Sequence, residues 1–513
     1  MPSTFPRART SLVRTLAAAP CLWLVFLLVT SSPADAAPLR AGAAKIDVTK
    51  REAGPARDPL WVKALVVSDG ATTAVLITVD AVAIGEIGPI RNDYLSKVRE
   101  QLTKEHGIQP THVAVNASHC HGIVCDDIDV KTVAAVKAAI EAQVPVKVGV
   151  GVGHENRIME NRRMRLKDGR EADVRHAYSL PPDETVADIG PIDPQIGVLR
   201  LDRLDGRTLA VVYNFACHPI QGVPGGGNTA DLTGYASKAI EESLGDNAIA
   251  LFVQGCGGDI NPVFYKDVDH PRDAEPLGNM LGLSTLRAVK RVACGDSTQL
   301  RVVHELLELP RADLAERIVS LQAEQNRLLQ SLRGTSLNFK TFLPLVVKYQ
   351  VAGEFPSYYA HRYLHDRQNG REDLKHLDEE NRRNMEAYLK NIHTMEELTR
   401  VQTNLALLKK HHQQNMDAGK RTLNVELVGI RIGDFVMITF PGELTVQIGL
   451  NLKKVSPHPH TFIAGYTNGY IYYAPTTEQL KNAGNAQEDS DCILAPHWQA
   501  IFEKKALEIL RKL

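Results

Sequence analysis

The chain has 513 residues, 44% of them apolar and 23% charged, which is typical of a globular protein with one large core or two to three ordinary ones. Its formal net charge of -1 excludes a global field that would attract nucleic acid or an anionic membrane. No nucleic-acid partner is therefore expected.

The first 36 residues have the pattern of a secretory signal peptide. Three arginines precede the apolar run CLWLVFLLV at 21–29, and the small-residue site Ala34-Asp35-Ala36 follows it. The run is too short to span a bilayer comfortably, so we expect cleavage before Ala37. The mature protein would then be secreted or periplasmic, with no transmembrane segment. An uncleaved anchor is the alternative.

Strand patterns then alternate with helical patterns. The run TTAVLITVDAVAIG at 72–85 is apolar at nearly every position, as in a strand buried on both faces. A helical pattern at 90–107, the strand pattern THVAVNAS at 111–118 and a helical pattern at 130–143 follow. The alternation predicts an α/β fold of mixed β-sheets flanked by helices, in a single module formed by residues 37–309 and 421–513.

Residues 310–420 have a different pattern. Leucine and isoleucine recur near heptad spacing from Leu314 to Leu332, and a second apolar stripe runs from Met385 to Leu408. Two long helices in an antiparallel hairpin are the simplest arrangement of such stripes. We therefore expect 310–420 to form an inserted helical arm. Structural packing, a lid and a homodimer contact all remain open as its role.

Side chains that can bind a metal stand where predicted strands end. In NASHCHG, His119 and His121 are one residue apart after an apolar run. Alternate side chains of a strand share a face, so both imidazoles would face one site. His218 precedes Pro219, which cannot continue a ladder, and Glu443 follows a Pro-Gly turn. Singly, each residue also fits an ordinary role at a strand end.

Three tyrosines, Tyr470, Tyr472 and Tyr473, close the segment TFIAGYTNGYIYYAP, which has a strand-like composition. Tyrosines often anchor the edge of a sheet, which is the structural alternative to a role in binding.

Together these motifs resemble the catalytic domain of the neutral, non-lysosomal ceramidases. SHCHG, CHP and PGE match short motifs of that family in order and spacing, and the resemblance runs from AGAAKIDVT almost to the C-terminus, outside the arm. The resemblance implies a zinc ion held by His119, His218, Glu443 and Tyr473. Imidazole and carboxylate ligands suit zinc, and a catalytic zinc site keeps one position open for water.

The resemblance also implies an exported hydrolase that cleaves an amide bond, or an ester bond, of a small molecule or lipid by metal-activated water. His121 would orient or deprotonate the water, or support His119 from outside the metal's ligand set. Arg162 matches the family's NRS segment and would hydrogen-bond a substrate oxygen, with a surface arginine as the alternative. Asp193 and Asp231 are interpreted as structural or supporting residues.

Two positions depart from the family pattern. Asn261, in GCGGDINPV, stands where the family has a serine implicated in catalysis, and Gln487 stands at a family tyrosine. An amide can donate and accept hydrogen bonds but cannot serve as an activated hydroxyl. We expect the zinc to be retained and Asn261 to assist catalysis. True ceramidase activity is one alternative, and a non-catalytic zinc protein whose arm binds a partner is another.

Six cysteines remain after the predicted cleavage, and an exported chain permits disulfides among them. Small buried packing residues are the simpler interpretation. The six are Cys120, Cys125, Cys217, Cys256, Cys294 and Cys492.

Overall fold

The computed structural model describes residue 11 and residues 38–513, except 175–179, 224–226 and 483–485. Apart from Ser11, the predicted signal peptide lies outside the described residues. Within the described ranges, no helix is both long and apolar enough to cross a membrane.

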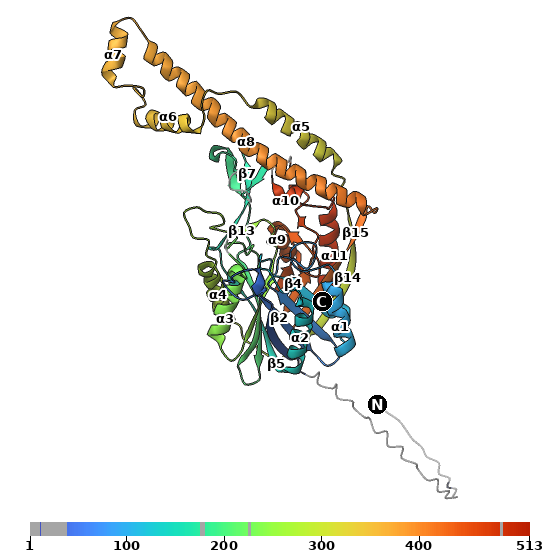
Figure 1. Ribbon diagram of the computed structural model, residues 1–513. Coiled ribbons are helices and arrows are strands. Elements are labelled where there is room, and N and C mark those ends of the chain that lie inside the picture. Colours follow the sequence, from blue (N-terminus) through green and yellow to red (C-terminus); the bar gives the residue numbers. More distant parts are fainter. Residues whose placement is uncertain (1–10, 12–37, 175–179, 224–226, 483–485) are drawn as a thin grey trace, which may run out of the picture. The chain divides into compact units, whose positions relative to one another are not determined.

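The largest sheet is mixed and has eight strands (Figure 1), in the order β12-β11-β10-β5-β1-β2-β3-β4. The pairs β3-β4 and β11-β12 are parallel, and the other neighbours are antiparallel. The strands are β1 (Arg40–Asp47), β2 (Trp61–Ser68), β3 (Thr73–Val79), β4 (Val113–Ala117), β5 (Val144–His154), β10 (Gln195–Arg203), β11 (Thr208–Phe215) and β12 (Ile249–Gln254).

Successive side chains of β3 enter two different cores. Val75 and Ile77 pack in the core beneath the helices on one face, whereas Ala74 and Leu76 pack in the core on the other face. Because neighbouring residues of a strand point to opposite faces, a strand buried on both sides must be apolar throughout. The predicted doubly buried strand is confirmed over Thr73–Val79, but it ends there and does not extend to Gly85.

A second, four-stranded sheet has the order β14-β15-β16-β18 and shares a core with the first. Leu199 and Leu201 of the large sheet meet Val428 and Ile430 of the small one in this core. Helices pack against the sheets, which confirms the predicted mixed α/β class. These elements are β14 (Leu300–Pro310), β15 (Thr422–Ile432), β16 (Phe435–Thr439), β18 (Thr461–Ala464), α1 (Tyr94–His106), α2 (Ile128–Glu141), α3 (Asp231–Leu244), α4 (Glu275–Val289), α9 (Val446–Val455), α10 (Gln487–Ser490) and α11 (Trp498–Lys512).

The fold also contains three small sheets, two of which connect segments that are separated in sequence. Glu443 of β17 pairs with Tyr473 of β19, and Ile260 of β13 pairs with Asn161 of β6. Short pairs of this kind fix the loops that follow the long strands. The strands are β6 (Met159–Asn161), β7 (Arg163–Leu166), β8 (Glu171–Asp173), β9 (Val186–Ile189), β13 (Ile260–Pro262), β17 (Glu443–Leu444) and β19 (Tyr473–Ala474).

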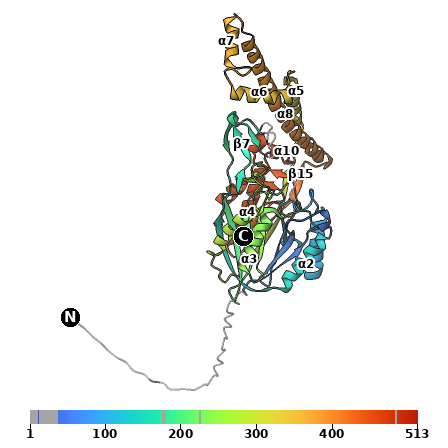
Figure 2. The ribbon, with the colours of Figure 1, turned by 60° about the vertical axis from the view of Figure 1, so that its left-hand side comes forward.

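The arm consists of α5 (Ala315–Ser331), α6 (Phe339–Val351), α7 (Ala360–Gln368) and α8 (Asp373–Asp417). Asn415 Nδ2 donates to the Ala312 carbonyl at 2.9 Å and the Arg333 N–H donates to Asn391 Oδ1 at 3.1 Å, so α5 and α8 run antiparallel. The expected long hairpin is therefore present. Figures 1 and 2 show α6 and α7, which the apolar stripes did not predict, at its far end.

The base of the arm contacts the tyrosine-rich segment. His411 Nε2 lies 2.7 Å from Asp491 Oδ1, and Gln414 Nε2 donates to Tyr472 Oη at 3.0 Å. The ammonium group of Lys410 also lies 4.6 Å from the centre of the Tyr472 ring. The last turns of α8 therefore support the loop that leads to β19.

The prediction of one strand over the tyrosine-rich segment is wrong in its middle. β18 ends at Ala464, and Tyr466, Asn468 and Tyr472 have φ angles of 52°, 61° and 64°. This left-handed region is unfavourable for residues other than glycine and turns the chain out of a strand. The Tyr466 N–H donates to the Gly442 carbonyl at 3.2 Å, which ties the turn to the segment before Glu443.

Among the described residues, the six cysteines from Cys120 onward form no disulfide, and four of them are buried. Their surroundings agree with the interpretation as packing residues.

Candidate metal centre

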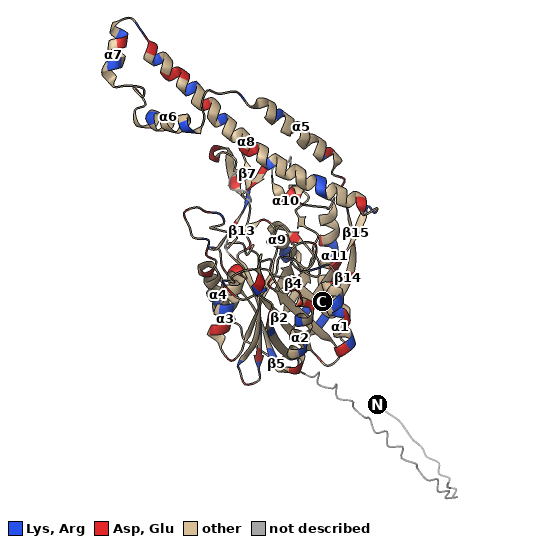
Figure 3. Cartoon of the chain, viewed as in Figure 1, with Lys and Arg blue, Asp and Glu red and all other residues tan. Residues whose placement is uncertain are grey.

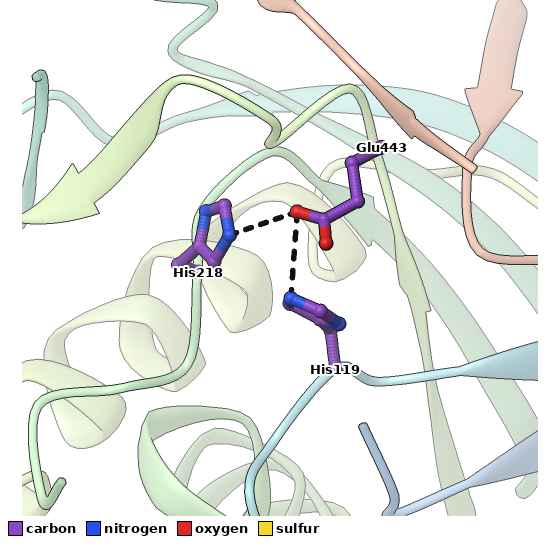
Figure 4. Close-up of side chains that lie close together, drawn as sticks. All are labelled: His119, His218 and Glu443. Atoms are coloured by element: carbon purple, nitrogen blue, oxygen red, sulfur yellow. Dashed lines mark hydrogen bonds and ion pairs between the residues drawn. The ribbon is translucent and has the colours of Figure 1, made fainter. Parts of the chain in front are cut away.

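His119, His218 and Glu443 converge on one point, as Figure 4 shows. One ligand atom from each lies within 4.8 Å of the others, and the side chains are 1–4% exposed. Glu443 Oε2 is 3.1 Å from His218 Nε2 and 3.5 Å from His119 Nε2. His119 and His218 follow the ends of β4 and β11, and Glu443 begins β17, so three distant segments form the site.

Backbone carbonyls fix the orientation of both imidazoles. His119 Nδ1 is 2.6 Å from the Val82 carbonyl oxygen, and His218 Nδ1 is 3.0 Å from the Ile260 carbonyl oxygen. A carbonyl only accepts, so each Nδ1 must carry the proton and donate it. In the neutral ring, Nε2 then presents a lone pair toward the carboxylate. Such facing acceptors repel one another unless a cation lies between them, and histidine ligands of metals are commonly held this way.

The protonation states suit a cation. Burial lowers the pKa of His119 to about 4, and burial together with the charge of Arg162 lowers the pKa of His218. Burial alone would raise the pKa of Glu443, but the neighbouring imidazoles and a hydrogen bond from Tyr470 lower it. Near neutral pH the rings are therefore uncharged and the carboxyl is ionised, which are the forms that bind a metal.

Two phenols hold the carboxylate of Glu443. Tyr470 Oη donates to Oε1, and Tyr466 Oη donates to Oε2 at 3.2 Å. Burial raises the pKa of both tyrosines, so they remain protonated donors. Sequence reasoning missed Tyr466, whose ring centre is 4.4 Å from that of His119. The sequence places Tyr466 in the tyrosine-rich segment, which was the only indication of a role. The left-handed turn that directs its side chain inward produces no periodic pattern in the sequence.

Tyr473 lies beside the centre. Its Oη accepts a hydrogen bond from Arg162 Nη2 at 3.1 Å, and its ring is stacked on that of His218 with centroids 6.5 Å apart. Its role as a metal ligand stays a prediction.

Arg162 is buried, with 1% of its surface exposed, so the alternative of a surface arginine is wrong. Its Nε donates to Glu488 Oε1 at 2.5 Å, and its Nη2 donates to the Gly258 carbonyl at 2.7 Å. Burial would lower the pKa of the guanidinium, but the charges of Glu488 and Tyr473 raise it well above its ordinary value. Arg162 is therefore a permanent cation beside the centre.

Asn261 is fully buried next to this arginine. Its Oδ1 accepts from Arg162 Nη1 at 3.2 Å, whereas its Nδ2 has no hydrogen-bond partner. The preceding residue, Ile260, supplies the carbonyl that orients His218. An unsatisfied buried donor costs free energy, so its presence near the centre indicates a place for a ligand atom.

The expectation that His119 and His121 share a strand face is wrong. β4 ends at Ala117, and His119 has a φ of 70°. The left-handed residue redirects the chain, so the alternation of a strand no longer applies. His119 is buried and His121 is exposed, with the ring centres 5.9 Å apart. Only His119 of this pair belongs to the converging group.

Gln254, which sequence reasoning missed, links the two histidine segments. Its Nε2 donates to the carbonyls of Ser118 at 3.1 Å and Cys217 at 2.8 Å, the residues before His119 and His218. The sequence feature that could have identified Gln254 is its position as a single amide at the end of the apolar strand IALFVQ.

Three other residues from the sequence analysis lie in supporting positions. Asp231 accepts the N–H groups of the loop after His218, and Asp193 pairs with Lys453 at 2.6 Å. Gln487 donates its N–H to Asp173, and its buried Oε1 has no partner. The contacts of the two aspartates agree with the structural interpretation.

No protein-family model and no curated protein matches this chain. Among solved structures, the chain is similar to neutral ceramidase from Pseudomonas aeruginosa, with 16% identity and a TM-score of 0.59, over 93% of this chain and 75% of that one. A ceramidase complexed with C2 is similar over 92% and 75%, with 16% identity and a TM-score of 0.58. The chain therefore has a ceramidase-like fold.

Proposed function

We propose that the chain is an exported zinc-dependent hydrolase that cleaves an amide bond, or an ester bond, with metal-activated water. The observation that carries the proposal is the convergence of His119, His218 and Glu443, with each Nδ1 held by a carbonyl and each Nε2 directed at the carboxylate. Two imidazoles and a carboxylate are a donor set that suits zinc.

Tyr473 is the fourth ligand in this proposal, held through its oxygen by Arg162. A zinc ion bound here would lower the pKa of a bound water and polarise a carbonyl. The exposed His121, beside His119, would take the proton from the water. Nδ2 of Asn261 would donate to the carbonyl oxygen as it gains charge, and the charge of Arg162 would stabilise the same atom.

A lipid amide is the substrate class that the fold similarity favours, and the true ceramidase reaction on an N-acyl sphingoid lipid is the narrower form of the proposal. Asn261 and Gln487 favour a second candidate, a non-catalytic zinc protein whose arm binds a partner. Neither amide can replace the hydroxyl that the resemblance places there.

The test is metal analysis followed by a hydrolysis assay. Purified protein with one equivalent of zinc should cleave at least one member of a panel of N-acyl and ester substrates. A chelator should abolish turnover, and added zinc should restore it. Zinc binding without turnover, together with a tight complex formed through residues 310–420, would support the non-catalytic candidate instead.

Removing the free donor of Asn261 should slow hydrolysis without releasing the metal. Asn261→Asp keeps the shape and the acceptor for Arg162 but places a negative charge where Nδ2 was. Loss of one oxyanion donor typically costs roughly 10²–10³-fold in kcat, and we expect a loss of that size with unchanged zinc content.

Steady-state kinetics with metal analysis measure this effect, and Asn261→Ser, which restores a hydroxyl, is the companion variant. A kcat of Asn261→Asp within twofold of the parent would remove Asn261 from the reaction.

A further inference from the structure

Helix α6 exposes a stripe of large apolar side chains. Phe339, Leu343, Val347 and Val351 follow at intervals of four residues and are 66%, 50%, 56% and 81% exposed. Residues four apart lie on one side of a helix, so the four side chains form a continuous strip. A strip of this kind is unusual on a surface that faces only water.

The other side of α6 is fixed to α8, so the strip must point outward. Phe342 is buried and its ring centre is 4.6 Å from that of Tyr388. Tyr349 Oη donates to Asp378 Oδ1 at 2.9 Å. Tyr358 and Tyr359, in the loop after α6, are also exposed, at 58% and 80%.

The segment that carries the strip is basic, although the whole chain has a net charge of -1. Residues 333–371 contain six Lys or Arg and two Asp or Glu, a net charge of six minus two, or +4. Figure 3 shows blue Lys and Arg positions on α6 and α7 at the end of the arm. The six are Arg333, Lys340, Lys348, Arg362, Arg367 and Arg371, and the two are Glu354 and Asp366.

We propose that α6 and the loop after it dock onto the surface of an anionic lipid bilayer. An apolar strip flanked by lysines, followed by a loop with two exposed tyrosines, has the composition of a helix that lies in the membrane interface. The lysines would be attracted to anionic headgroups, and their long side chains would reach them while the strip enters the acyl region. In a symmetric dimer through this face, two copies of the basic segment 333–371 would repel each other, whereas anionic headgroups would attract it, which favours the bilayer over a second copy.

Vesicle co-sedimentation tests the docking without any assay of hydrolysis, so its failure is separate from failure of the proposed function. The parent protein should bind vesicles of phosphatidylglycerol and phosphatidylcholine at 0.1 M salt more strongly than vesicles of phosphatidylcholine alone. The triple variant Phe339→Ser, Leu343→Ser, Val347→Ser should lower the bound fraction at least tenfold, and Lys340→Glu with Lys348→Glu should remove the preference for the anionic vesicles.

The matched control is Leu204→Ser with Val268→Ser, which removes two exposed apolar side chains outside the arm and should leave binding unchanged. Circular dichroism should show the parent helix content in every variant. Equal binding by parent and triple variant would overturn the proposal. The proposal would also be overturned if the parent protein sedimented as a dimer and the triple variant as a monomer, while both bound vesicles equally.

Discussion

Replacing His218 with alanine is expected to remove most of the bound metal and, with it, hydrolysis. The change deletes one imidazole of the converging group and leaves Glu443 facing His119 alone. Loss of a residue that merely supports a ligand typically costs 10–100-fold in metal affinity, so loss of a ligand should cost more than about 100-fold. Equilibrium competition against a zinc-binding dye measures the affinity directly.

The matched control is His458→Ala, because His458 Nε2 lies 2.7 Å from the Leu510 carbonyl oxygen and is not one of the three converging side chains. It should retain full metal content. Both variants should fold, as judged by thermal melting, since a lost buried hydrogen bond costs about 1–3 kcal/mol. Full metal occupancy in His218→Ala would show that the three side chains do not form the binding site.

Replacing Arg162 with alanine is expected to destabilise the whole protein as well as to impair its reaction. The guanidinium is 1% exposed, and its main partner, Glu488, is fully buried. Removing one member of a buried ion pair leaves a buried charge uncompensated, which typically costs about 3–5 kcal/mol. The melting temperature should fall by roughly 3–5 °C, which differential scanning calorimetry would detect.

Two companion variants separate charge from geometry. Arg162→Lys keeps the positive charge but not the fork that reaches Glu488, Gly258 and Tyr473 together, so an intermediate loss of stability is expected. Arg207→Ala breaks an exposed pair with Asp205 and should change the unfolding free energy by less than about 0.5 kcal/mol. An unchanged melting temperature in Arg162→Ala, with lost activity, would show that Arg162 acts only on the substrate.

The elements with a clear period could be predicted from the sequence. The doubly buried β3 and the long stripe of α8 have apolar patterns that local geometry dictates. The residues of the candidate centre came from the short motifs SHCHG, CHP and PGE, each of which stands at or just after the end of a strand pattern. His119, His218 and Glu443 therefore came together as the resemblance implied.

The contacts around the ligands could not be predicted in the same way. Tyr466 reaches Glu443 through a turn with positive φ, and Gln254 joins two loops that are far apart in sequence. Such positions depend on tertiary contacts rather than on local preference. The exposed face of α6 could not be recognised from the sequence either. The helix also carries apolar side chains on its other face, such as Phe342, which packs on α8, so its sequence is apolar on both sides.

The length of α8 has a consequence for how the protein would meet a lipid. Its 45 residues correspond to about 68 Å of helix, and the interval from Tyr388, beneath α6, to His411, at the base, corresponds to about 35 Å. That interval exceeds the hydrocarbon depth of one leaflet, which is about 15 Å. An upright arm would hold the candidate metal centre clear of the bilayer, so that only molecules already dissolved in water would reach it. A reclining arm would bring it down to the headgroups. The angle between the arm and the bilayer, rather than the affinity of the arm for lipid, would then decide whether the centre receives molecules from water or from the membrane surface.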